Sequence, residues 1–148
     1  MDRTSTGNGE NLMIDHMTFR VSDLARTKEL YTAALAPLGY KLAFEFSGAE
    51  TGFIGFGYPD VNVPNGMKID TWFADGPSPY GGHLITTGCH LCWQAPNRVA
   101  VDAFYKAAIE QGAKDNGPPG LRPMYHPNYY GAFVIDHDGN NVEACCHY

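Results

Sequence analysis

Basic residues are scarce in this sequence, and it contains no long apolar run. Lys and Arg number 10 against 16 Asp and Glu among the 148 residues, which gives a formal net charge of −6. Nucleic-acid binding relies on a basic surface that neutralises phosphates, so nucleic acid is not an expected partner. A membrane span requires about 18 consecutive apolar residues. The sequence contains no such stretch, and we expect no membrane partner.

The N-terminal residues also lack export signals. Residues 1–12 are polar and rich in Gly and Asn, with neither the apolar core of a signal peptide nor the Arg-rich pattern of a transit peptide. We expect a flexible N-terminal tail at 1–12, with the folded domain beginning at Met13. The expected location is cytoplasmic, where the four cysteines would be reduced thiols.

Two of the cysteines, Cys89 and Cys92, have the C-x-x-C spacing of many zinc and redox sites. The sequence around them, CHLCW, predicts a strand. Residues three apart in a strand point to opposite faces, so this pair is not expected to chelate a metal.

Apolar patterning in the first half predicts a strand, a helix and three further strands. The first strand-like segment alternates in part, with His16 on its polar face. Apolar residues then recur at helical spacing until Gly39, a residue type that commonly ends helices. The predicted elements are a strand at 14–21, a helix at 24–38, and strands at 41–46, 52–57 and 68–74.

The same pattern restarts after a linker at 75–82 that is rich in Pro and Gly. The predicted elements of the second half are a strand at 87–94, a helix at 97–111, an irregular segment at 114–131, and strands at 132–135 and 141–147. When His16 is aligned with His90, the two predicted helices are aligned as well. When the turn before Asp70 is aligned with the turn before Glu143, the carboxylates of these two residues fall at equivalent positions of the repeat. The repeat predicts two copies of one β-α-β-β-β unit.

These patterns together predict an α+β fold of two βαβββ modules. We expect a single domain at 13–148, with the first module at about 13–75 and the second at about 86–148. Eight strands and two principal helices are expected, and their curved mixed sheets are expected to enclose a metal cleft. Exposed strand edges are commonly covered by pairing, so we also expect a homodimer.

Three segments resemble one protein family over nearly the whole chain, from Met13 to the C-terminus. They are IDHMTFRVSDLARTKELYTAALAPLGY, CHLCWQAPNRVAVDAFYKAA and YYGAFVIDHDGNNVEACC. They resemble the vicinal oxygen chelate superfamily, which includes glyoxalase I, bleomycin-resistance proteins, fosfomycin-resistance enzymes and extradiol dioxygenases. The most specific parts are His16, His90 and the motif DGNNVE, which ends in Glu143.

This resemblance implies a divalent-metal site. In the superfamily the ligands come from the first, fourth, fifth and eighth strands, which implies the set His16, Asp70, His90 and Glu143 here. The fourth-strand ligand is commonly Glu, and Asp70 is one methylene shorter. The other three residues alone would form a face of two histidines and one carboxylate, with positions open for two adjacent substrate oxygens. Imidazole and carboxylate ligands suit Fe, Mn, Ni, Co or Zn and do not choose between them.

The resemblance also implies a catalytic role for Glu143, which would move a proton of the substrate. His126, in the segment MYHPNYY, is a second catalytic candidate, because the usual pKa of histidine suits proton transfer near neutral pH. Loops of this composition also fold over sheets without a catalytic role, and both interpretations of His126 stay open. For the metal site, the alternative is a degenerate site retained as scaffolding.

Strand alternation adds candidate pocket residues beside the predicted ligands. They are Arg20, Trp72, Cys92, Gln94, Cys145 and His147. Most of them are expected to serve packing.

The leading functional hypothesis is a metal-dependent, glyoxalase-like lyase or isomerase acting on a small, oxygen-rich substrate that the metal chelates. The same residues fit an extradiol-type dioxygenase if Asp70 does not bind the metal. A third hypothesis is a non-catalytic resistance protein that sequesters a flat drug between aromatic side chains. The sequence leaves open the substrate, the metal, and whether the modules pair within one chain or between chains.

Overall fold

The structure is a computed structural model that describes residues 14–82 and 84–148. The predicted tail at 1–12 lies outside the described residues. In chain order the elements are β1 (Met17–Arg20), α1 (Leu24–Leu35), the 3-10 turn η1 (Ala36–Leu38), β2 (Lys41–Ser47), β3 (Gly52–Pro59), the 3-10 turn η2 (Pro64–Gly66), β4 (Met67–Ala74), β5 (His90–Gln94), α2 (Arg98–Glu110), β6 (Lys114–Leu121), β7 (Tyr130–Ile135) and β8 (Asn141–Cys146).

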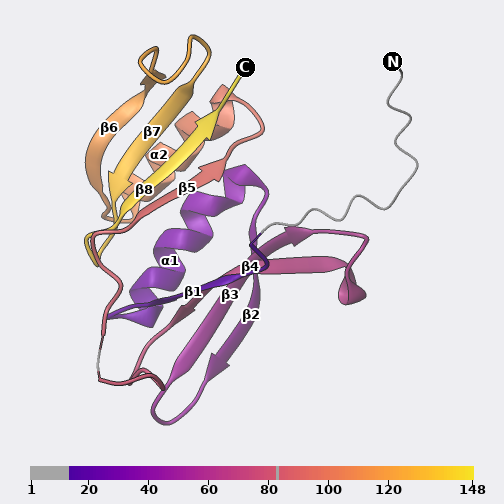
Figure 1. The fold of residues 1–148 in the computed structure, drawn as a ribbon, viewed down its shortest axis with the longest axis vertical. Helices are drawn as coiled ribbons and strands as arrows, with labels where there is room; N and C mark the ends of the chain where they lie inside the picture. Colours follow the sequence, from indigo (N-terminus) through magenta and orange to yellow (C-terminus); the bar gives the residue numbers. More distant parts are fainter. Residues whose placement is uncertain (1–13, 83) are drawn as a thin grey trace.

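The strands form two separate four-stranded sheets, one from each module. Their strand orders are β1-β4-β3-β2 and β5-β8-β7-β6, so the two modules repeat one topology. In each sheet the first strand pairs in parallel with the last, while the remaining pairs are antiparallel. Figure 1 shows the first module in indigo to magenta below the second in orange to yellow. The predicted α+β fold of two βαβββ modules is confirmed, and the two sheets do not close into a barrel.

Equivalent side chains begin the two helices. The Asp23 carboxylate accepts a 2.9 Å hydrogen bond from the backbone N–H of Arg26 before α1. The Asn97 side chain accepts a 2.9 Å bond from the backbone N–H of Ala100 in α2. Such caps satisfy N–H groups that have no partner within the helix. The two helices therefore start at matching points of the repeat.

A single hydrophobic core joins the two modules. Tyr31 of α1 is 2% exposed, and its ring centroid lies 4.4 Å from that of Phe73 on β4 and 6.1 Å from that of Trp93 on β5. Phe104 of α2 is fully buried in the same cluster. Because residues of both modules pack together here, the relative position of the two sheets is set largely by buried aromatic contacts.

Strand β6 corrects the sequence analysis, which predicted an irregular segment at 114–131. The structure places Lys114–Leu121 at the outer edge of the second sheet, paired with β7. The register shifts around Gly117, and Pro118 and Pro119 also lie within the strand. Proline has no N–H to donate, so it is tolerated at a sheet edge but not in its middle. Because proline and glycine are unusual within strands, the sequence pattern did not predict β6.

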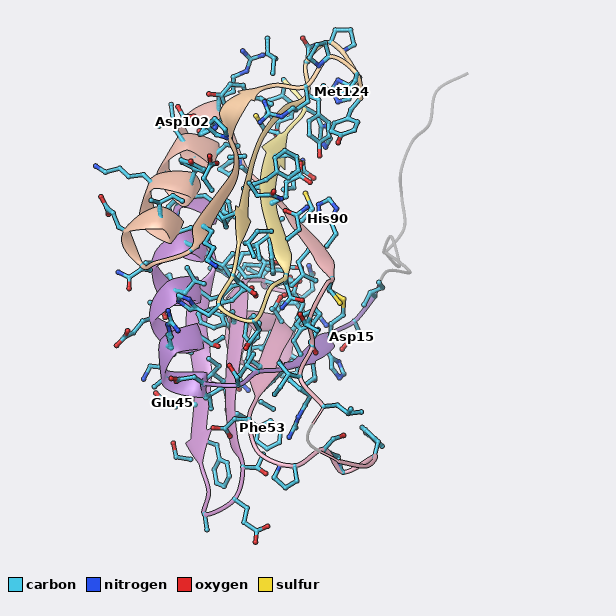
Figure 2. All side chains as sticks on the ribbon, turned by 90° about the vertical axis from the view of Figure 1, so that its left-hand side faces the viewer. Asp15, Glu45, Phe53, His90, Asp102 and Met124 are labelled. Carbon is cyan, nitrogen blue, oxygen red and sulfur yellow. The ribbon has the colours of Figure 1, made fainter. Side chains whose placement is uncertain are left out.

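The helices and the candidate ligand His90 lie on opposite sides of the sheets. Figure 2 shows α1 and α2 on one side, with the labelled side chains of Asp15 and His90 on the other. Within the described part of the chain, neither helix has the length and apolarity needed to cross a membrane.

Candidate functional site

Glu143 is a buried carboxylate on β8 with two side-chain partners. Only 2% of its surface is exposed. The Nε2 atom of His90, at the start of β5, lies 2.8 Å from Glu143 Oε2, and the Tyr129 hydroxyl donates a 2.5 Å hydrogen bond to Glu143 Oε1. The His90 side chain is 54% exposed. This arrangement joins a buried carboxylate to an imidazole that solvent reaches.

Strand pairing and a glycine position the Glu143 carboxylate. The parallel register of β5 and β8 sets Cys92 opposite Glu143, so His90 reaches the carboxylate diagonally from two residues earlier on the same face. On the neighbouring strand β7, a Cβ atom at Gly131 would lie 3.1 Å from Glu143 Oε1, which is closer than ordinary van der Waals contact. Glycine at position 131 therefore leaves room for the carboxylate.

Two thiols lie beside Glu143 on the same face of the sheet. Cys92 Sγ lies 3.5 Å from Cys145 Sγ, and ligand atoms of both cysteines lie within 4.8 Å of a Glu143 oxygen. Cys145 is 5% exposed, whereas Cys92 is exposed at the surface. Strand alternation predicted that Cys92 shares a face with His90 and Cys145 with Glu143; the parallel pairing of β5 and β8 brings the two cysteines together. Cys89 is not part of this group, as expected for residues three apart in a strand.

The close contacts in this group shift the pKa values of its members in opposite directions. Its hydrogen bond to Cys145 raises the pKa of the Cys92 thiol, and partial burial of the sulfur atom raises it further. The same bond, accepted by Cys145, lowers the pKa of that thiol. Burial, followed by hydrogen bonds to Cys145 and Glu143, raises the pKa of Tyr129. The Tyr129 hydroxyl therefore stays protonated at neutral pH and can act as a donor to Glu143.

His126 lies at the border of the same face. Its Nε2 atom is 2.8 Å from Nδ1 of His147, and the Nε2 atom of His147 lies 3.9 Å from Cys145 Sγ. The rings of His126 and Tyr129 are in edge contact, with centroids 5.4 Å apart. His126 is thus connected to the Glu143 group through His147 and Tyr129, without contacting Glu143 directly.

Asp70 lies on β4 as the extra residue of a β-bulge, opposite a shift in the β3–β4 register. Its Oδ2 accepts a hydrogen bond from the Tyr40 hydroxyl and its Oδ1 accepts one from the Thr71 hydroxyl, both 2.8 Å long. Burial, together with the hydrogen bond to Asp70, raises the pKa of Tyr40, which therefore remains a donor. Asp70 and His90 line one cavity of about 280 Å³ between the modules.

His16 directly precedes β1 and lies apart from the other predicted ligands. Its side chain is 59% exposed, and its Nδ1 atom is 2.7 Å from the Asp15 carboxylate, which also binds Lys68. His16 lines a second cavity of about 350 Å³ together with Trp72, whose ring packs against Phe44. Among residues 14–82 and 84–148, the four predicted ligands therefore do not line one common cavity within a single chain.

Arg20 and Tyr129 show where sequence reasoning misjudged the site. Arg20 was a candidate for pocket lining, but its Nη2 atom donates to the backbone carbonyls of Asp75, Gly76 and Pro77. It holds the segment after β4 in place. Tyr129, in the segment MYHPNYY beside His126, is a direct partner of Glu143 that the sequence does not indicate. The contact arises because Tyr129 directly precedes β7, the strand next to β8.

Comparison with known proteins agrees with the fold. Residues 13–144 match the family described as Glyoxalase/Bleomycin resistance protein/Dioxygenase superfamily. A glyoxalase/bleomycin resistance protein from Albidiferax ferrireducens T118 has 26% sequence identity and a TM-score of 0.62, over 90% of this chain and 98% of that protein.

A second solved structure shows the same fold at lower identity. Glyoxalase I from Zea mays has 22% identity and a TM-score of 0.63, over 89% of this chain but only 43% of the maize chain. A search of curated proteins found no match. Because the family match extends from the start of the first module almost to the end of β8, this chain belongs to the glyoxalase/bleomycin resistance protein/dioxygenase superfamily.

Proposed function

We propose that this chain is a metal-dependent enzyme with glyoxalase-like lyase or isomerase activity on a small, oxygen-rich substrate. The observation that carries the proposal is the buried Glu143 carboxylate, 2% exposed and 2.8 Å from the accessible imidazole of His90. A carboxylate oxygen and an imidazole nitrogen at this separation fit a shared divalent ion, of the group Fe, Mn, Ni, Co or Zn. Membership of the superfamily supports this assignment.

The chain's own residues suit proton transfer next to such an ion. When bound, a divalent cation would polarise adjacent substrate oxygens and neutralise charge that develops on them. Glu143 would accept and return a substrate proton through the oxygen that faces His90. The hydrogen bond from Tyr129 to the other oxygen fixes the orientation of the carboxylate during this transfer.

We extend the proposal to a homodimer in which two copies complete each site. In one chain, His16 and His90 line different cavities, and their side chains are 59% and 54% exposed. A second copy would bring His16 and Asp70 of one chain opposite His90 and Glu143 of the other, as a two-fold axis permits. A reducing cytoplasmic setting fits the four free cysteines.

His126 is our candidate for a proton carrier at the edge of the site. Its contact with His147 connects it to Cys145 and Tyr129, which in turn contact Glu143. A His126→Gln variant is expected to bind metal normally and to lose turnover rather than substrate affinity. An unchanged kcat would assign His126 to loop packing instead.

The arrangement of Asp70 favours a second candidate function, an extradiol-type dioxygenase. Both of its carboxylate oxygens already accept hydrogen bonds, from Tyr40 and Thr71. If Asp70 keeps these bonds, the remaining set of His16, His90 and Glu143 has the composition of the two-histidine, one-carboxylate face that suits Fe(II) oxygenases.

Non-catalytic sequestration of a flat drug is the third possibility. The aromatic pair of Trp72 and Phe44, with ring centroids 5.3 Å apart, lies beside the cavity that contains His16. An aromatic wall of this kind can hold a planar ligand without any metal.

The deciding experiment measures metal content and turnover together. Protein purified without a metal-chelating column is analysed for metal, then assayed with hemithioacetals and with catechols after loading with Fe, Mn, Ni or Zn. We expect metal to copurify and hemithioacetals to be converted. Catechol cleavage under Fe(II) alone would establish the dioxygenase instead. Tight binding of planar drugs by metal-free protein, with no turnover of either substrate, would refute both enzymatic functions.

A further inference from the structure

The face formed by β5 and β8 carries more metal-binding groups than the proposed oxygen and nitrogen ligands. Its side chains include His90 and Cys92 from β5, Glu143 and Cys145 from β8, and His147 directly after β8. Alternate residues of a strand share a face, and the two strands are adjacent and parallel, so these groups lie in two neighbouring rows. The two cysteines are free thiols.

We propose that Cys92, Glu143 and Cys145 form a sulfur-containing metal site that takes Zn²⁺ or a similarly thiophilic divalent ion, with His90 as the fourth ligand. This inference deepens the proposed function and rests on it, because both need Glu143 and His90 as metal ligands. It differs in naming two sulfur ligands and therefore the chemical class of the metal.

The distances in the group fit such an ion. Ligand atoms of Cys92, Glu143 and Cys145 all lie within 4.8 Å of one another, and the two sulfur atoms are 3.5 Å apart. In a tetrahedral zinc site with Zn–S bonds of about 2.3 Å, two sulfur ligands lie about 3.8 Å apart. The imidazole of His90 is not part of this 4.8 Å group, but its Nε2 atom lies 2.8 Å from Glu143 Oε2, at the accessible side of the site.

The sulfur atoms decide which metal is preferred. Thiolates favour Zn²⁺ and other soft or borderline ions, whereas oxygen ligands suit Mg²⁺, Ca²⁺ or Mn²⁺. Glu143 and Cys145 are buried, and the exposed side chains of Cys92 and His90 leave a path for the ion from solvent. The site is thus built on two rigid strands with two buried and two accessible ligands.

A cobalt titration of the reduced, chelator-treated full chain tests the inference, because Co²⁺ bound by thiolates gives strong sulfur-to-cobalt charge-transfer absorption. We expect this absorption in the parent and its loss in Cys92→Ser and in Cys145→Ser. In both variants the Zn²⁺ affinity, measured in competition with Co²⁺, should fall at least about tenfold. Even mutations of residues that only contact a metal ligand typically cause a loss of this size. Cys89→Ser is the matched control, since its thiol lies outside the group.

Cys145 is buried, so folding of its variant must be checked by circular dichroism, and Cys92→Ser at the surface gives an independent answer. In the parent, Zn²⁺ should also protect Cys92 from alkylation and leave Cys89 reactive. Cobalt bound without charge-transfer absorption, and lost in His16→Ala but not in Cys92→Ser, would overturn the sulfur site and leave the proposed function standing.

A different result would support the sulfur site and refute the proposed enzymatic function. Charge-transfer absorption that survives in His16→Ala, in a protein that converts neither hemithioacetals nor catechols, would support the sulfur site and refute the proposed enzyme. No cobalt binding by the parent would refute both.

Discussion

The hydroxyl group of Tyr31 in α1 donates a 2.8 Å hydrogen bond to the carboxylate of Asp136, which follows β7 in the other module. The same carboxylate accepts backbone N–H bonds of 3.0 Å from Asp138 and 2.8 Å from Asn140. Asp136 therefore holds the turn that leads into β8 and connects this turn to the first module. Through it, the helix of one module supports the strand that carries Glu143 in the other.

Removing this hydroxyl should destabilise the whole domain. Tyr31 is 2% exposed, and a buried hydrogen bond to a charged group contributes about 1.5–3 kcal/mol. We expect Tyr31→Phe to lower the free energy of unfolding by about that amount, measured by urea denaturation. The control is Tyr130→Phe, whose hydroxyl donates to Asp102 at the surface and should matter by less than about 0.5 kcal/mol. Equal losses in both variants would contradict this account.

Metal binding should depend on the predicted ligands to different degrees. We expect His90→Ala and Glu143→Ala to lose bound metal and activity, because each removes one member of the 2.8 Å pair. Asp70→Ala should cause a milder loss, since its carboxylate is engaged by Tyr40 and Thr71. The measurement is metal stoichiometry, with a thermal melt of each variant to verify folding.

Two results would change this interpretation. Full metal occupancy in Glu143→Ala would remove Glu143 from the site. Loss of metal in Asp70→Ala as complete as in His90→Ala would favour the four-ligand, glyoxalase-like site over the three-ligand dioxygenase.

A mixed dimer tests whether two copies share each site. His16→Ala and His90→Ala chains, each inactive alone, are co-expressed with different tags, and the heterodimer is purified. If His16 of one copy works with His90 of the other, one of the two sites in the heterodimer is intact, so about half of the parent activity should return. An inactive heterodimer would place each site within one chain, and monomers in light scattering would exclude sharing altogether.

His137 makes stability depend on pH. Burial, followed by the charge of Arg26, lowers the pKa of His137, and its buried Nε2 atom has no hydrogen-bond partner among the residues that the structure describes. The unfolded chain therefore binds more protons than the folded one once the pH falls below about 6.5, and the free energy of unfolding decreases in that window. The effect is absent above the unfolded-state pKa.

Urea denaturation at about pH 7.5 and about pH 5.5 measures this effect. The parent should lose more stability between the two values than His137→Gln, which does not titrate. An identical loss in parent and variant would show that other groups cause the acid sensitivity.

The sequence pattern captured elements whose signals are local. The helix starts at Asp23 and Asn97 and the alternation in β8 follow from residues close together in the chain. The repeat of His16 at His90 follows from comparing two such local patterns. These signals were sufficient for the fold class, whereas the grouping of His90 with Glu143 was implied by the family resemblance. They were not sufficient for β6, whose prolines and glycines violate strand preferences that an edge position relaxes.

Features that depend on strand neighbours could not be predicted in the same way. The closeness of Cys92 and Cys145 depends on the parallel register of β5 and β8, which no local pattern specifies. The hydrogen bonds of Asp70 to Tyr40 and Thr71 depend on a bulge in β4. The separation of His16 from His90 depends on how the two modules pack, which is decided by contacts of the whole core.

The two prolines of β6 also bear on how copies of this chain can associate. Pro118 and Pro119 offer no backbone N–H along the outer edge of the second sheet, and the register is irregular there. At the outer edge of the first sheet, β2 carries the charges of Lys41 and Glu45. The prolines of β6 and the charges of β2 both disfavour the pairing of a further strand at these edges. Such pairing is how exposed strand edges start aggregation. Self-association is thereby directed to the faces of the sheets, and uncontrolled growth through these two edges is suppressed.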